Sequence, residues 1–270
     1  MTGPGTGDAL VLVDVAGPVA RVTLNRPERG NGVTYALAAR LREAVDDLAA
    51  RRDVRVVVLT GAGRQFCVGG DLSGDAFAAD RRQTPIEQDV RAQRERGQLA
   101  VALRELPQIT IAAVNGGCAG AGLALALACD LRIASAAAVF RTAYLDAGVS
   151  GDYGVTWLLP ALLGEARARE LMLLSEKLDA EQALRLGLVT RVVPAAELSS
   201  TVDDLATRCA ARAPLAVAAI KQNLGDAATW SLAEHLAAES DRQVRTARSA
   251  DAAEAAAAFL AKRPPVFRGE

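Results

Sequence analysis

Two glycine-rich segments are the parts of this sequence whose residue types could do chemistry through the backbone alone. They run from Gly61 to Leu72 and from Val114 to Ala124, and each begins where an apolar run ends. Glycine lets the chain approach a ligand closely and point amide N–H groups at it. A helix that starts near Gly120 would add its positive amino end to the same place.

Two such loops side by side would supply two N–H donors to one oxygen that gains negative charge. Removing one donor of this kind typically costs about 2.7–4 kcal/mol of transition-state stabilisation. The dinucleotide fingerprint does not fit, because Phe66 and Leu125 stand where it needs a small residue. The alternative interpretation of both segments is a tight turn between a strand and a helix, without a ligand.

The few histidine and cysteine residues restrict the chemistry further. The single histidine, His235, excludes a His-rich metal site, and the amphipathic stretch 229–248 around it favours a solvated helix face over a catalytic role. The four cysteines form no C-x-x-C pair, so they are interpreted as reduced, packed thiols. Cys67 and Cys118 lie beside the glycine-rich segments but have no basic partner in the sequence that would make them nucleophiles.

The elements that must position these loops alternate between strands and helices. This alternation predicts right-handed βαβ crossovers and a parallel sheet, and ligands bind at the carboxyl edge of such a sheet. The predicted strands are Leu10–Val15 and Val19–Asn25, which form a hairpin, then Arg55–Thr60, Ile109–Val114, Leu131–Ala134 and Val189–Val193. The predicted helices are one capped by Thr34, one near Gln93–Leu106, then Gly120–Cys129, Glu165–Leu174, Ala180–Leu186 and most of Glu197–Lys262. We therefore predict an α/β core over residues 1–196 and a C-terminal helical region over residues 197–270.

Composition excludes several classes of partner. The 270 residues carry 31 Lys and Arg against 32 Asp and Glu, so net charge gives no reason to expect nucleic acid or an anionic membrane as a ligand. The longest apolar stretch, residues 118–129, is shorter than the roughly 20 residues that span a bilayer. Met1–Asp8 lacks the basic start and apolar core of a signal peptide, which favours a cytoplasmic protein.

A cluster of arginines precedes and enters the second predicted helix. It contains Arg81, Arg82, Arg91, Arg94 and Arg96. Acidic residues are interleaved with these arginines at Asp80, Glu87, Asp89 and Glu95. The mixed charge favours a solvated helix or a mobile cover over an anion-binding surface.

A set of motifs, in order along nearly the whole chain, resembles the crotonase superfamily of enoyl-CoA hydratases and isomerases. The motifs are Asn25–Asn31, Phe66–Leu72, Val114-Asn-Gly, Gly120-Ala-Gly, Cys129-Asp, Phe140–Tyr144, Gly148–Asp152, Ala180–Pro194 and Ala258–Arg263. The resemblance implies a crotonase-like spiral ββα core, a C-terminal helical trimerisation region, and homo-trimers or hexamers. It also implies an acyl-CoA thioester as substrate and no bound cofactor, since the substrate carries the coenzyme A.

The resemblance assigns roles to particular residues. It implies that the amides of Gly70 and Ala121 hold the thioester oxygen and that Asp71 keeps the first loop in shape. The backbone around Val68 would lie against the adenine, and Phe259 and Lys262 match tail positions that can reach a neighbouring subunit's coenzyme. The full implied set for substrate and CoA is Arg29, Val68, Gly69, Gly70, Asp71, Leu72, Ala121, Phe259 and Lys262.

The sequence departs from the family at the two glutamates that activate water in its hydratases. Those positions are Ala124 and Tyr144 here, so the paired carboxylates are missing. Alanine transfers no proton, and a tyrosine with its ordinary pKa of about 10 is a poor base at neutral pH. Tyr144 is instead expected to line the acyl pocket or to hydrogen-bond to the substrate.

Asp152 is the remaining candidate for proton transfer. The segment around it resembles that of ring-modifying isomerases and of the aromatic dehalogenase, which carry a working aspartate there. We predict double-bond isomerisation with Asp152 as acid and base, although this side chain could instead cap a helix over residues 153–163. Three alternatives stay open: a hydratase with non-standard water-activating groups, an aryl-CoA hydrolytic enzyme with Asp152 as nucleophile, and a catalytically silent CoA-binding protein.

Overall fold

The fold is centred on a six-stranded sheet in this computed structural model, which describes residues 9–71 and 84–270. The strand order is β1 (Val11–Ala16), β2 (Val19–Leu24), β3 (Val56–Gly61), β4 (Ile109–Val114), β6 (Leu131–Ser135) and β9 (Arg191–Val193). The first two strands form the predicted antiparallel hairpin, and every later pairing in this sheet is parallel. A smaller sheet joins β5 (Cys118–Ala119), β7 (Val139–Arg141) and β8 (Leu178–Asp179).

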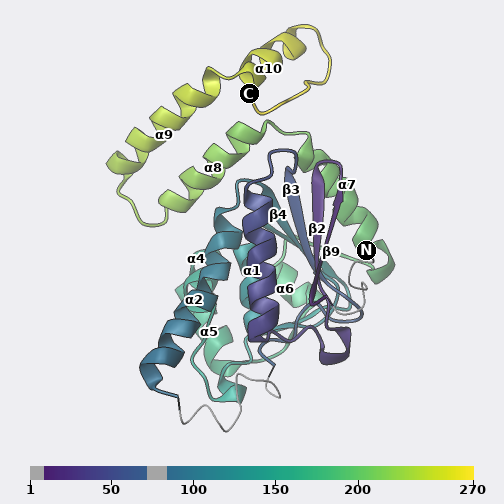
Figure 1. The fold of residues 1–270 in the computed structure, drawn as a ribbon, viewed down its shortest axis with the longest axis vertical. Helices are drawn as coiled ribbons and strands as arrows, with labels where there is room; N and C mark the ends of the chain where they lie inside the picture. Colours follow the sequence, from purple (N-terminus) through teal and green to yellow (C-terminus); the bar gives the residue numbers. More distant parts are fainter. Residues whose placement is uncertain (1–8, 72–83) are drawn as a thin grey trace, which may run out of the picture.

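Both faces of the large sheet are covered, which explains the continuous apolar runs of its central strands. In β3, Val57 and Leu59 pack into one buried cluster and Val56 and Val58 into another. The helices on the first side are α1 (Tyr35–Ala49), α2 (Ile86–Glu105) and α3 (Ala121–Ala128), and α7 (Leu198–Ala210) covers the second side. Figure 1 shows α1 and α2 in front of the sheet and α7 on its other side.

Helix α1 begins as the sequence predicts. The side chain of Thr34 accepts a hydrogen bond of 3.1 Å from the amide of Leu37, which satisfies one free N–H of the first turn. Helix α2 begins at Ile86, two turns before the predicted start near Gln93. The first two turns are exposed and mostly polar, and their two large apolar residues, Ile86 and Val90, are too few to give the apolar periodicity from which a helix is recognised in sequence.

Three further helices complete the core, namely α4 (Val155–Leu163), α5 (Glu165–Leu174) and α6 (Ala180–Leu186). The final predicted strand is shorter than expected, because the chain enters β9 only at Arg191. Helix α6 ends just before this strand, at its C-cap residue Gly187, whose φ is 80°. The amide of the next residue, Leu188, donates a hydrogen bond to the carbonyl of Ala183 in the helix. This glycine conformation is typical of helix C-termini.

The last three helices extend away from the sheet. They are α8 (Pro214–Asp226), α9 (Leu232–Ala247) and α10 (Ala250–Leu260), and Figure 1 places α9 and α10 beyond α8. Within the predicted helical region, α7 therefore belongs to the sheet's own packing, and only the helices after it project outward. The division into residues 1–196 and 197–270 stays a prediction.

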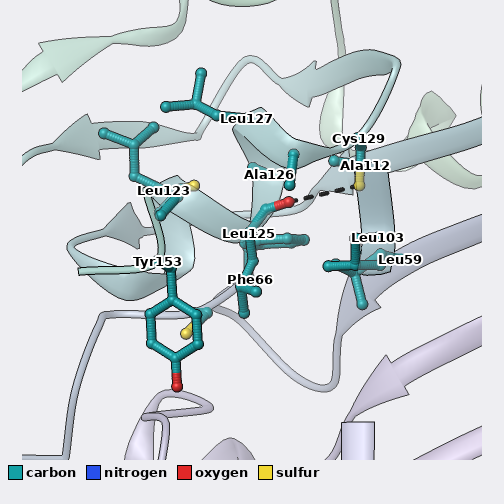
Figure 2. Packing of buried hydrophobic residues seen from close by; sticks show 14 of the residues in the cluster. Leu59, Phe66, Leu103, Ala112, Leu123, Leu125, Ala126, Leu127, Cys129 and Tyr153 are labelled. Atoms are coloured by element: carbon teal, nitrogen blue, oxygen red, sulfur yellow. Dashed lines mark hydrogen bonds between the residues drawn. The ribbon is translucent and has the colours of Figure 1, made fainter. Parts of the chain in front are cut away.

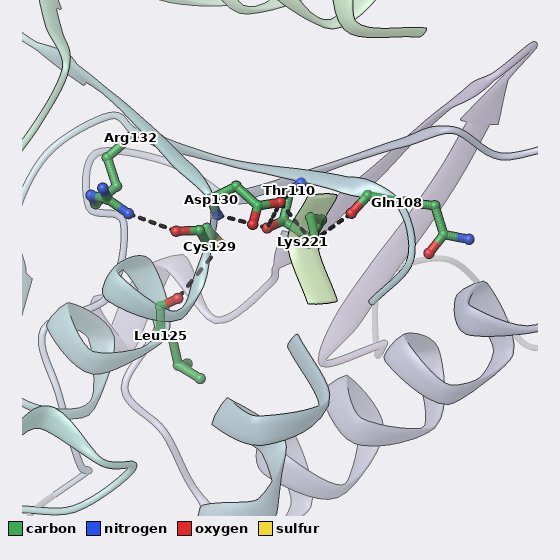
Figure 3. A network of polar contacts seen from close by, with 7 residues as sticks. All are labelled: Gln108, Thr110, Leu125, Cys129, Asp130, Arg132 and Lys221. Atoms are coloured by element: carbon green, nitrogen blue, oxygen red, sulfur yellow. Dashed lines mark hydrogen bonds and ion pairs between the residues drawn. The ribbon is translucent and has the colours of Figure 1, made fainter. Parts of the chain in front are cut away.

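Helix α8 is fixed to the sheet by the polar network in Figure 3. The ammonium of Lys221 donates to Asp130 Oδ2 at 2.6 Å and to the carbonyl of Gln108 at 2.7 Å. The same carboxylate oxygen accepts the amide of Thr110 at 2.8 Å. Because both charged side chains are partly buried, the pair joins the start of β4 and the turn before β6 to the projecting helices.

None of the helices in the described part of the chain combines the length and hydropathy that a bilayer span requires. The cytoplasmic location stays a prediction.

Candidate active site

The two glycine-rich segments lie side by side at the carboxyl ends of β3 and β4. Cys67 pairs with Cys118 as in a parallel sheet: its amide donates to Gly117 O at 3.0 Å, and its carbonyl accepts from Ala119 N at 2.9 Å. Both thiols are fully buried. This pairing fixes the position of one loop against the other.

Glycine is required where these loops touch. A Cβ on Gly69 would lie 3.2 Å from the carbonyl oxygen of Ala119, which is closer than an ordinary contact, and a Cβ on Gly120 would lie 3.4 Å from the Cα of Gly69. Both residues also have positive φ, 108° for Gly69 and 49° for Gly120. At Gly122 a Cβ would be 2.3 Å from the carbonyl oxygen of Cys67, so no side chain fits there.

The geometry leaves the amides of Gly70 and Ala121 available to a ligand. Val33 bonds the residues on either side of Gly70, because its amide donates to Gly69 O at 2.8 Å and its carbonyl accepts from Asp71 N at 3.1 Å. In a parallel pairing of this kind the N–H of the middle residue points away from the partner. Ala121 is the first residue of α3, so its N–H has no carbonyl partner within the helix.

Both amides belong to residues that line one cavity of about 320 Å³. The described residues in its wall are otherwise mostly small or apolar, with one carboxylate, Asp152, and one cation, Arg96. The wall also contains Tyr35, Tyr144 and Tyr153, which are all the tyrosines of the chain.

Asp152 is bound to Tyr144 inside this cavity. The hydroxyl of Tyr144 donates to Asp152 Oδ1 at 2.7 Å, and only 5% of Tyr144 is exposed. Burial raises the pKa of the Asp152 carboxyl, and the hydrogen bond from Tyr144 and the charge of Arg96 partly oppose that rise. Burial, with the negative charge of Asp152, also raises the pKa of Tyr144 far above its usual value, so this hydroxyl stays a donor.

The alternative that Asp152 caps a helix is wrong. Helix α4 begins at Val155 with Gly154 as its N-cap, and no side chain caps it. Tyr153, between the aspartate and this cap, has a φ of 46°, which is rare for a residue with a side chain. In Figure 2 its ring extends from the buried cluster that includes Leu123 and Phe66, and its hydroxyl points away from that cluster.

Other predicted site residues support or border the cavity. Asp71 forms an ion pair with Arg26, with 2.9 Å between Nη2 and Oδ2, which ties the first loop to the segment after β2. Val68 lies in the cavity wall with 44% of its surface exposed, and its methyl groups fill the space beside Gly30. Arg29 is exposed in the neighbouring short turn and does not line the cavity.

Two predicted residues lie away from the cavity. Phe259 is 83% exposed on α10, Lys262 follows that helix, and neither lines the cavity within this chain. Leu72 lies outside the described residues. At the first family glutamate position, Ala124 is fully buried in α3 and is absent from the cavity wall.

The cysteines and the histidine take no part in this site. Burial raises the pKa of Cys67 to about 12 and that of Cys118 well above its usual value, so both remain neutral thiols. Asp146 faces Arg141 and Ser175 rather than the cavity. The prediction of a solvated His235 is wrong, because its side chain is only 15% exposed on α9. In the described ranges, no cluster of three His, Cys, Asp or Glu side chains is placed to hold a metal ion.

The part of the wall that α1 and α2 contribute is not among the predicted site residues. Arg96 was interpreted as part of a solvated helix, but its guanidinium carbon lies 3.9 Å from the ring centroid of Tyr35 and it lines the cavity. Gln93, one helical turn earlier on α2, lines the same wall. The i, i+3 spacing of these two polar residues was a usable signal, since it puts them on one helix face.

Comparison with known proteins identifies the family. The family model described as enoyl-CoA hydratase/isomerase matches residues 14–270. The chain belongs to this family. The predicted resemblance to the crotonase superfamily is thus confirmed, and the protein is an enzyme of the enoyl-CoA hydratase/isomerase family, a group of lyases and isomerases.

Members of the enoyl-CoA hydratase/isomerase family match this chain over nearly its whole length. It is 39% identical to the 1,2-epoxyphenylacetyl-CoA isomerase of Escherichia coli K12 over 264 residues, 96% of this chain and 98% of that protein. The crystal structure of an enoyl-CoA hydratase from Bacillus anthracis superposes with a TM-score of 0.90 at 31% identity, covering 97% of this chain and 100% of that one. A second, from Polaromonas sp. JS666, gives 0.89 at 36% identity, over 95% and 99% of the two chains. The crotonase fold is therefore confirmed.

Proposed function

We propose that this enzyme moves the double bond of an enoyl-CoA thioester, with Asp152 carrying the proton and the amides of Gly70 and Ala121 holding the thioester oxygen. One observation supports the proposal: Gly70, Ala121 and Asp152, the last being the one carboxylate among the described lining residues, all line a single cavity. The reaction needs one proton carrier and one place for negative charge. The cavity has one candidate for each.

The chemistry follows from these groups. The ionised Asp152 removes a proton from the carbon next to the thioester carbonyl of a 3-enoyl-CoA, and the electron pair moves onto the carbonyl oxygen. Two N–H donors stabilise that oxygen as it becomes negative. The protonated Asp152 then returns its proton to the fourth carbon, which gives the 2-enoyl-CoA. A carboxyl whose pKa is raised by burial is better suited to taking the first proton than an exposed one.

Hydration is the less favoured reaction. Adding water needs a group that activates it, and the two positions that carry glutamate in the family's hydratases are Ala124 and Tyr144 here. Tyr144 is a hydrogen-bond donor to Asp152 and its raised pKa keeps it protonated. The relative from Escherichia coli K12 is named an isomerase, which supports the same choice.

We also propose the position of coenzyme A and the assembly of the enzyme. Val68, Gly69, Asp71 and the exposed Arg29 would form the cavity entrance on the coenzyme side. The projecting helices carry many exposed apolar side chains, which favours their burial against other copies in a homo-trimer or hexamer. These side chains are Leu215, Ile220, Leu224, Leu232, Leu236 and Val244. Phe259 and Lys262 would then reach the coenzyme of a neighbouring subunit.

The test is proton exchange in deuterated water. The enzyme should introduce deuterium into the second and fourth carbons of a 3-enoyl-CoA, and Asp152→Asn should slow this roughly 10²- to 10⁴-fold, the usual contribution of a positioned acid–base group. Asp146→Asn is the matched control, because that carboxylate binds Arg141 and Ser175 outside the cavity.

The alternatives give different results. Exchange at the wild-type rate in Asp152→Asn removes this residue from the mechanism. A covalent acyl-enzyme trapped with 4-chlorobenzoyl-CoA favours Asp152 as a nucleophile, and net addition of water favours a hydratase. Tight binding of CoA thioesters without exchange favours a silent binding protein.

A further inference from the structure

The cation in the cavity wall neither carries the proton nor holds the thioester oxygen in the isomerisation described above. Arg96 lies on α2 and stacks on the ring of Tyr35, with 3.9 Å from the guanidinium carbon to the ring centroid. One guanidinium nitrogen donates to the side-chain oxygen of Gln93 at 2.6 Å. Stacking uses the face of the guanidinium and leaves its edge, with four further N–H groups, for other partners.

Asp152 balances the charge of Arg96 without binding it. Among the described residues Arg96 forms no ion pair, although its positive charge lowers the pKa of Asp152 against the effect of burial. A purely apolar acyl group that fills the cavity would displace water from the edge of the guanidinium. The N–H donors on that edge would then have no acceptors. Leaving a charged group unpaired in this way weakens binding.

We propose that Arg96 determines substrate specificity by donating a hydrogen bond to a neutral oxygen of the acyl group, beyond the carbons that exchange protons. The substrate class is then an acyl-CoA that carries an ether, epoxide, hydroxyl or carbonyl oxygen. Tyr35, Tyr144 and Tyr153 provide a broad, largely apolar wall around that point, which suits a cyclic acyl group. This inference rests on the proposed acyl-CoA function.

A carboxylate on the acyl group fits the cavity less well than a neutral oxygen. With Asp152 ionised, Arg96 and Asp152 together are neutral, and a second carboxylate would leave one uncompensated negative charge in a partly enclosed space. It would also raise the pKa of Asp152 further, since like charges disfavour ionisation. The proton carrier would then spend less time as a base.

Binding of non-reacting thioesters tests this inference. The probes are cyclohexylacetyl-CoA and the three isomers in which one ring CH₂ (position 2, 3 or 4) is replaced by oxygen, so that shape stays constant while the acceptor moves. We expect at least one isomer to bind the wild-type enzyme roughly tenfold more tightly than the carbocycle, as a hydrogen bond to a charged donor predicts. Arg96→Met should abolish that preference.

The control is Arg94→Met, because Arg94 is an exposed residue of the same helix that does not line the cavity. It should keep the preference. Arg96→Lys provides a second variant that retains the charge and should keep only part of the preference, since lysine cannot stack and donate as a fork. Thermal unfolding of each variant confirms that it is folded.

Two results would overturn the inference: equal affinity for the carbocycle and all three oxygen isomers, or a preference that survives in Arg96→Met. Tighter binding of 4-carboxycyclohexylacetyl-CoA than of any neutral isomer would also contradict it. Deuterium exchange separates this inference from the proposed function. Exchange without oxygen preference contradicts the role of Arg96 alone, and Arg96-dependent preference without exchange contradicts the isomerisation alone.

Discussion

At the scale of single residues, the pairing of Tyr144 with Asp152 controls the proposed chemistry. Its 2.7 Å hydrogen bond occupies one carboxylate oxygen, Oδ1, of the aspartate that lines the cavity. Both partners lie next to a non-glycine residue with positive φ, 61° at Ala143 and 46° at Tyr153. Such conformations persist only where the surrounding structure enforces them, and they are concentrated at functional sites.

Tyr144→Phe should shift the pH dependence of proton exchange. The phenol donates to the ionised carboxylate and so favours it, and without this bond the pKa of Asp152 rises further. The acidic limb of the pH profile of kcat/KM should therefore move to higher pH, with a smaller change on the alkaline plateau. An unchanged acidic limb would show that Asp152 is not the group that titrates there.

Asp152→Asn should change stability in a pH-dependent way. The folded state raises the pKa of this carboxyl, so the folded protein binds its proton more tightly than the unfolded chain does. Stability is then lost as pH rises from the unfolded pKa through the folded one. The variant should unfold at a higher temperature than wild type at pH 8, and the two should converge near pH 3. A variant that is less stable at pH 8 contradicts the cost of burying this charge.

The sequence was informative for some of these residues and silent for others. Asp152 could be singled out because its segment matches a family motif and because Ala124 and Tyr144 remove the usual carboxylates. The bond between Tyr144 and Asp152 could not, since it joins residues eight apart that are flanked by two left-handed non-glycine residues, a conformation that no local propensity favours. The prediction of a solvated position for Arg96 is wrong, because the mixed charges around it are typical of a solvated helix. Only its packing on the ring of Tyr35, which the sequence does not show, places it in the cavity wall.

At the scale of elements, the site depends on two loops whose contact excludes side chains. The Cys67–Cys118 pairing brings the loops together, and Gly69, Gly120 and Gly122 permit the approach. These glycines were predicted to serve a close backbone approach to a ligand. The structure shows that they also allow the backbones of the two loops to lie against each other. The positions of the glycines in the sequence do not reveal this contact between loops.

Gly122→Ala tests this contact. The new Cβ would lie 2.3 Å from the carbonyl oxygen and 2.6 Å from the Cβ of Cys67, so the loops must move apart. We expect a loss of about 1–3 kcal/mol in the free energy of unfolding, as for other overpacked interiors, together with slower proton exchange. Gly225→Ala is the matched control, because no described atom lies within 4 Å of its added Cβ.

Chemical denaturation provides the measurement, and the control should be as stable as wild type or more so, since alanine is the better helix former. Equal stability of the two variants would contradict the steric role of Gly122.

At the scale of the whole molecule, two parts with different surfaces meet at α8. The sheet and its helices bury a large apolar core, whereas the projecting helices have no fully buried large side chain of their own. Helical periodicity in the sequence predicted these helices, but not that their apolar faces would lie uncovered in a single chain. Lys221 fixes the junction through Asp130.

Leu224→Asp should prevent the proposed association. Leu224 is 68% exposed on α8, and a carboxylate buried there between copies would lack a partner. Sedimentation velocity should give the mass of a trimer or hexamer for wild type and a smaller mass for the variant. Leu12→Asp, on the exposed side of β1, is the control and should keep the wild-type mass. A wild-type chain that sediments alone at all concentrations contradicts the assembly.

Gly70 and Ala121 offer main-chain nitrogens, and mutation of neighbouring side chains leaves those atoms in place. The proposed thioester-binding corner can thus be inherited unchanged while the side chains of the rest of the cavity wall are replaced. The reaction type and the preferred acyl group can therefore change during evolution while the fold stays the same. A directed-evolution library for new activities would accordingly randomise Arg96, Tyr144 and Asp152 and spare the glycines.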